Sequence, residues 1–177
     1  VSLRSTYQLV RPARARSWGF SYIWQSSIPR KLFFFMWCLL NAQLPVDDML
    51  ENFQVHGPSK CHCCMQAQPE TLLHVFSTGQ LANGTWAFFE QSLGITTPTI
   101  TVRSRCQTWW LFPMKGKVQR WITRVLPLLI LWFLWRVRNM SRFEGHKLSS
   151  SKVRILIMNE LRMLIKIHFP GIADLPH

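Results

Sequence analysis

Three long stretches of apolar side chains predict buried helices. Residues 31–40 are apolar on every side, which is typical of a helix that protein surrounds completely. Residues 117–143 contain the longest apolar run, and residues 151–168 repeat apolar side chains at helical spacing. Ser151 is a suitable N-cap for the last helix, and Pro127 is expected to break or kink the middle one. The pattern therefore predicts a mainly helical fold.

Shorter patterns occupy the first half of the chain. Residues 1–11 predict a short helix, which Pro12 ends. Aromatic side chains alternate with other residues along 17–26, as they do in a strand. Residues 45–53 and 81–93 predict two further helices, the first with a Pro and two Asp residues at its start.

The same pattern divides the chain into three segments. Residues 1–93 are expected to form a small helical domain that contains an irregular, zinc-knuckle-like segment rich in Cys and His. Residues 94–116 are rich in Gly, Thr and Pro and are expected to form a long surface connection. Residues 117–177 are expected to form a basic helical C-terminal region.

The charge of the chain is strongly basic and is concentrated in its last third. The 177 residues carry 21 Lys and Arg against 8 Asp and Glu, a net charge of +13. Such a balance favours an acidic partner, with nucleic acid first and an anionic membrane surface second. The few carboxylates include no spaced set of the kind that a two-metal hydrolase or polymerase requires.

The apolar run at residues 125–135 is predicted to be a buried helix and not a membrane span, because a span needs about 20 apolar residues. The first thirty residues show no apolar segment of a signal peptide. Cys63 and Cys64 are adjacent, which suits a disulfide framework poorly. We therefore expect an intracellular, reducing compartment, with the nucleus as one candidate.

A Cys/His cluster carries the clearest chemistry. Cys61 and Cys64 form a C-x2-C pair, whose two thiolates can grip one face of a zinc ion, and His74 is a candidate third ligand. The expected place of a fourth ligand is Gly79, which has no side chain. The fourth ligand therefore stays open among water and four side chains, His62, Cys63, Cys106 and His56. The alternative is a relic site whose Cys and His side chains only pack.

An ordered series of motifs resembles one known family. The series begins with Ile-Pro-Arg-Lys at 28–31, Phe-Phe-Met-Trp at 34–37 and Leu-Pro-Val-Asp-Asp at 44–48. The Cys/His cluster with its Glu-Thr pair at 70–71 follows, and Trp-x-x-Arg-Asn stands at 135–139. Together these motifs resemble the reverse-transcriptase zinc-binding domain. That domain occurs in plant LINE-type (non-LTR) retrotransposon polyproteins and in plant genes named for ribonuclease H.

The resemblance implies a function and neighbouring domains. In that family the domain follows a reverse-transcriptase domain and often precedes a ribonuclease H domain. It is taken to bind zinc and, by implication, nucleic acid. Gly79 stands where the family has a cysteine, so the resemblance implies a zinc site that lacks one ligand.

Basic side chains of the last third are the candidate nucleic-acid contacts. Arg154, Arg162 and Lys166 repeat at multiples of four, and Arg138 lies in a mixture of basic and aromatic residues before them. Basic side chains could meet the phosphates of RNA or single-stranded DNA, and the Trp pair at 109–110 could stack on bases. The alternative is that these basic side chains only form the solvent-exposed face of a helix.

The preferred interpretation is a non-catalytic, retrotransposon-derived module that binds nucleic acid and carries a degenerate zinc site. No nucleophile with an orienting carboxylate or an oxyanion motif is recognisable, so we predict that the chain is not an enzyme. The alternative is a decayed polyprotein fragment that acts as a scaffold or has no biochemical activity. Salt-dependent RNA binding distinguishes the two interpretations.

Overall fold

The computed structural model describes residues 28–51, 54, 59–66, 68–97 and 101–172, and in these residues it is helical with no strand. The prediction of a mainly helical fold is confirmed. The helix and strand predicted within residues 1–27 lie outside the described residues, as does His56. The main helices are α3 (Arg30–Leu40), α5 (Gln80–Leu93), α6 (Val102–Leu111), α7 (Lys117–Asn139) and α8 (Ser150–His168). The short elements are α4 (Asp47–Glu51), the π-helical turns η1 (His74–Thr78) and η2 (Met140–Glu144), and the 3-10 turn η3 (Pro170–Ile172).

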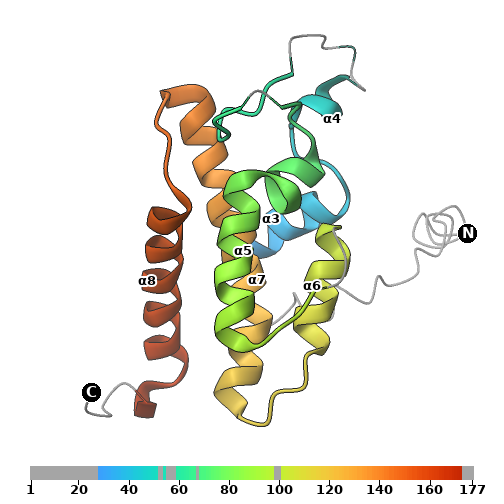
Figure 1. Ribbon diagram of the computed structural model, residues 1–177. Coiled ribbons are helices and arrows are strands. Elements are labelled where there is room, and N and C mark those ends of the chain that lie inside the picture. The colour runs from blue at the N-terminus through green and yellow to red at the C-terminus, as the bar shows by residue number, and fades with distance from the viewer. Residues whose placement is uncertain (1–27, 52–53, 55–58, 67, 98–100, 173–177) are drawn as a thin grey trace, which may run out of the picture.

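Helix α7 is the central element of the bundle and packs against α3, α5, α6 and α8 (Figure 1). Its residues 128–131 have no exposed surface. The helix continues through Pro127, so the proline does not break it. Packing on every side compensates for the backbone hydrogen bond that the proline cannot make.

By length and composition, the helical stretch Lys117–Glu144 could cross a membrane, but 61% of its most apolar part is buried in this structure. The burial predicted for the run at 125–135 is therefore confirmed for most of its side chains. Such burial against other helices is what a core helix requires.

The segment at 94–116 contains a helix that the sequence pattern does not predict. In α6, Cys106, Trp109 and Trp110 are buried, and the ring of Trp109 packs edge-on against Trp86 at 5.9 Å. The side chain of Thr101 caps the helix by accepting a hydrogen bond from the backbone N–H of Ser104 (3.2 Å). One hydrophobic core thus runs through all three of the segments defined above.

Helix α8 lies along one side of the bundle, against α5 and α7 (Figure 1). Its N-cap is Ser149, whose hydroxyl accepts from the backbone N–H of Lys152, and not Ser151 as predicted. The helix buries Val153, Ile157 and Leu161. This apolar spacing of four residues is what the sequence predicted for the inner face.

Candidate metal centre

Cys61 and Cys64 belong to a tight loop between α4 and η1. The backbone N–H of Cys61 donates to the carbonyl oxygen of Gln68 (2.8 Å), which closes the loop. Both cysteines are buried, with 2% and 7% of their surface exposed. The loop therefore turns its two thiols inward, as a zinc knuckle does.

His74 begins the π-helical turn η1, which a set of hydrogen bonds holds in place. The backbone N–H of His74 donates to Thr71 Oγ1 (3.0 Å), and Trp86 Nε1 of α5 donates to the carbonyl oxygen of Phe76 (2.9 Å). Phe76 has no exposed surface, so the turn is anchored in the core. Single π-helical turns are frequent at functional sites, where they re-aim a side chain.

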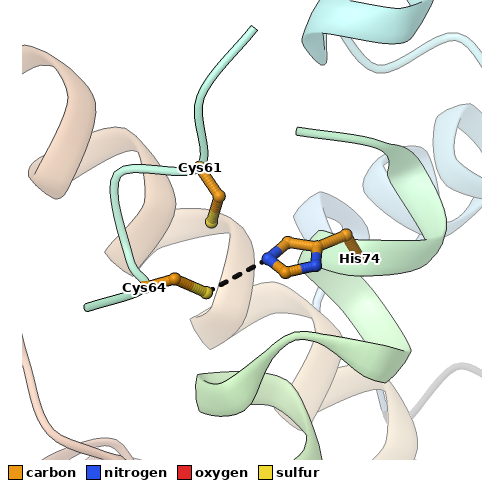
Figure 2. Close-up of side chains that lie close together, drawn as sticks. All are labelled: Cys61, Cys64 and His74. Carbon is orange, nitrogen blue, oxygen red and sulfur yellow. Dashed lines mark hydrogen bonds between the residues drawn. The ribbon is translucent and has the colours of Figure 1, made fainter. Parts of the chain in front are cut away.

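The three predicted ligands converge. Cys61 Sγ, Cys64 Sγ and a ring nitrogen of His74 all lie within 4.8 Å of one another, and Cys64 Sγ is 3.1 Å from His74 Nε2. Figure 2 shows the two thiols and the imidazole pointing toward one another from the loop and from η1. Local sequence spacing alone predicted this group.

The donor set fits zinc. With Zn–S bonds near 2.3 Å and Zn–N bonds near 2.0–2.1 Å, neighbouring donors of a tetrahedral site should lie about 3.6–3.8 Å apart. Here the three donor atoms all lie within 4.8 Å of one another, with 3.1 Å between Cys64 Sγ and His74 Nε2, so shifts of about an ångström or less would give that spacing. The cavity beside them, of about 10 Å³, has room for one small ion or water. Two thiols and an imidazole also match the soft and borderline donors that zinc prefers.

Burial sets the protonation of the ligands. It lowers the pKa of His74, so the imidazole is neutral near pH 7 and free to bind a metal. It also raises the pKa of Cys64. The pKa of Cys61 is raised chiefly because its thiol donates a hydrogen bond to Cys63, and this bond lowers the pKa of Cys63. Metal binding at this cluster therefore has to displace thiol protons.

Gly79 faces the cluster, as the sequence predicts for a fourth-ligand position, but the space beside it is closed. Gly79 lines the same cavity, and its backbone N–H donates to the carbonyl oxygen of His74 (2.8 Å). A Cβ added at position 79 would lie 2.5 Å from that oxygen and 2.9 Å from His74 Nε2. A side chain at this position therefore requires the backbone to shift.

The other candidates for a fourth ligand occupy different places. Cys63 lies on the wall of the cavity, but its sulfur is not in the group of donor atoms that lie within 4.8 Å of one another. Cys106 is a core thiol on α6, away from the three ligands, and burial raises its pKa to about 12. His62 is half-buried and is not in the ligand group formed by the described residues. Cys63 is thus the remaining sulfur beside the cavity in the described part of the chain.

Comparison with known proteins agrees with this geometry. Residues 1–86 match the family model described as zinc-binding in reverse transcriptase. No curated protein and no solved structure matches the chain. The match spans the Cys/His cluster and ends at Trp86, inside α5. The resemblance to the reverse-transcriptase zinc-binding domain is therefore confirmed for this part of the chain.

A buried ion-pair network joins the segment that carries the Cys/His cluster to α7. Glu70 has no exposed surface, and Arg138 Nε donates to both of its carboxylate oxygens (3.1 and 3.0 Å). Arg142 donates to the same carboxylate (3.1 Å) and pairs with Asp47 of α4. The network therefore fastens three parts of the chain to one another.

The prediction that Arg138 contacts nucleic acid is wrong. Arg138 is 1% exposed, and its guanidinium also donates to the carbonyl oxygen of Pro45 (3.2 Å). A guanidinium bound in this way cannot reach a phosphate. Its carboxylate partner lies 68 positions away, so no local pattern reveals the pair. The available signal was Glu70, an isolated acidic residue between the predicted ligands.

The other predicted basic contacts remain at the surface. Arg162 and Lys166 are exposed. Arg154 is half-buried, and its guanidinium lies 4.7 Å from the ring centre of Phe88. The Trp pair at 109–110 is buried and is therefore not available for base stacking.

Proposed function

We propose that this chain is a non-catalytic module of a reverse-transcriptase polyprotein that binds zinc and single-stranded nucleic acid, RNA in particular. The parent polyprotein would be of the plant LINE type, with a reverse-transcriptase domain before the module and a ribonuclease H domain after it. The observation that best supports this proposal is the convergence of Cys61, Cys64 and His74 in a segment that matches the zinc-binding family.

Zinc would have a structural role at this site. The three ligands are buried, and they come from the loop and from η1, which is anchored to α5. A bound ion would cross-link the loop to the turn, and its binding free energy would add to that of folding.

The basic surface proposed to meet phosphates lies at one end of the bundle. The ring of Trp121 near the start of α7 stacks on His168 at the end of α8, with ring centres 5.1 Å apart. This contact brings Lys117, which is exposed at the start of α7, to the end of α8 that carries Arg162 and Lys166. Exposed cations from two helices can neutralise several phosphates of a nucleic acid, and the release of the counterions bound to those phosphates favours binding.

The test combines metal content with salt-dependent binding. We expect one zinc per purified chain, removed by a chelator, and an affinity for a single-stranded RNA that falls steeply as salt rises from 50 to 200 mM. On a single strand, the slope of log K against log salt should be about −0.7 per phosphate neutralised. Absence of stoichiometric zinc would contradict the metal half of the proposal, and salt-independent affinity would contradict the nucleic-acid half.

A second candidate is a scaffold that docks a neighbouring part of the polyprotein. It is favoured by four exposed apolar side chains on α8. Ile155, Leu156, Met163 and Ile167 are 60%, 41%, 61% and 74% exposed. Phosphate binding does not require these side chains. Zinc binding together with RNA affinity that salt does not change would favour the scaffold.

A further inference from the structure

The Cys/His cluster is one donor short of a closed structural zinc site. Such sites are almost always four-coordinate, whereas three protein ligands leave a position for water. Cys61, Cys64 and His74 supply three donors, and all three are buried. A fourth protein donor would have to come from the wall of the small cavity between them.

The position that the family pattern assigns to this donor is occupied by backbone contacts. Gly79 holds the carbonyl oxygen of His74 through its N–H, and a Cβ there would lie 2.5 Å from this oxygen. The chain has therefore closed the space that a cysteine at position 79 would use.

Cys63 is the sulfur that remains at the cavity wall in the described residues. It lines the same cavity as the three ligands and accepts a hydrogen bond from the Cys61 thiol. Its sulfur is therefore already within hydrogen-bond reach of one ligand. Residues 62–63 form a turn, where neighbouring side chains need not alternate between opposite sides as they do in a strand.

An additional thiolate would change the net charge of the site. Three thiolates and one neutral imidazole around Zn²⁺ leave a net charge of −1. The nearest carboxylates, Asp47 and Glu70, are paired with Arg138 and Arg142, and these guanidinium groups offset part of their negative charge.

We propose that Cys63 is the fourth zinc ligand of this chain and replaces the cysteine that is missing at position 79. The inference rests on the proposed zinc site. On binding, the thiols of Cys61, Cys63 and Cys64 release their protons to solvent, and Cys63 exchanges its hydrogen bond with Cys61 for the metal. A change of side-chain rotamer at Cys63 is the movement required.

X-ray absorption on the zinc-loaded full chain counts the ligands directly. Zn–S distances near 2.3 Å differ from Zn–N and Zn–O distances near 2.0–2.1 Å. We expect three sulfurs and one nitrogen for the original chain. We expect two sulfurs and two nitrogen or oxygen neighbours for Cys63→Ser, with zinc affinity lowered at least about tenfold in a chelator competition.

His62→Ala is the matched control, because it alters the neighbouring residue of the same turn. It should keep three sulfurs and the original affinity. Circular dichroism of the metal-free Cys63→Ser protein should match that of the original chain, since Cys63 is only half-buried.

The outcomes separate this inference from the function on which it rests. Two sulfurs in the zinc-loaded original chain, or a Cys63→Ser protein with unchanged affinity, would overturn the role of Cys63 while zinc binding stands. A chain that takes up no zinc at all would overturn both.

Discussion

Replacing Arg138 by Met tests whether the buried ion-pair network holds the fold together. The change would leave the Glu70 carboxylate, which has no exposed surface, without its main partner. Removing one member of a buried ion pair typically costs about 3–5 kcal/mol. Arg142 still donates to Glu70 at 3.1 Å, so we expect the lower end, about 3 kcal/mol. For a chain of this size, that corresponds to a decrease in Tm of about 6–12 °C.

Urea unfolding followed by tryptophan fluorescence and by far-UV circular dichroism measures this cost. The double variant Glu70→Met/Arg138→Met removes both charges, and it should be more stable than Arg138→Met alone because no carboxylate is left unpaired. Arg136→Met is the matched control, an exposed arginine of the same helix, and should change the free energy of unfolding by less than about 1 kcal/mol.

One result would refute this reasoning. If Arg138→Met costs less than about 1 kcal/mol and also flattens the salt dependence of RNA binding, Arg138 points outward in solution. It would then have the phosphate-binding role that the sequence suggested, and the network would not be what fastens the segment with the Cys/His cluster to α7.

Three further predictions concern the metal and the basic surface. Gly79→Cys should not tighten zinc binding, because the added Cβ meets the backbone; chelator competition measures this, with Gly79→Ala as the control for the Cβ alone. Arg162→Gln/Lys166→Gln should reduce the magnitude of the RNA salt slope by about 1.4, whereas the charge-matched control Arg30→Gln/Lys31→Gln should change it less. Zinc affinity should rise with pH between 6 and 8, because the thiols of Cys61 and Cys64, whose pKa values are raised, must lose their protons on binding. The rise should be up to about 100-fold per unit from these two thiols, and up to about tenfold more if Cys63 also releases a proton.

Each of these predictions has a contrary result. Tighter zinc binding by Gly79→Cys would show that the turn at position 79 opens, and would also count against Cys63. An unchanged salt slope in the α8 variant would move the phosphate contacts elsewhere. A zinc affinity independent of pH would mean that the ligand thiols are already ionised in the metal-free protein.

The sequence predicts the helices that have a strong apolar period, and it fails where burial depends on distant partners. Helices α3, α7 and α8 follow from their apolar runs. Helix α6 does not, because polar and basic residues interrupt its apolar positions, and the glycines and prolines around it resemble a loop. Its Thr101 and Ser104 cap was the local signal that could have revealed it.

The same distinction applies to the candidate site. Cys61, Cys64 and His74 are close in sequence, so spacing and the chemistry of zinc predicted their convergence. Arg138 was misassigned because the composition of the chain does not show whether a basic side chain faces solvent or a buried carboxylate. Its environment is decided by Glu70, which lies on a different element and far away in the chain.

The span of the ion-pair network bears on how such a segment can be inherited. The family match ends at Trp86, yet Trp86 packs against Trp109, and the partner of Glu70 is Arg138. A recombination or insertion event with its breakpoint between Trp86 and Arg138 would transfer Cys61, Cys64 and His74 and leave the buried Glu70 carboxylate without Arg138. In lineages that keep the folded module, we therefore expect residues after Trp86 to be inherited together with Cys61, Cys64 and His74. The inherited unit would then be longer than the segment that matches the family model.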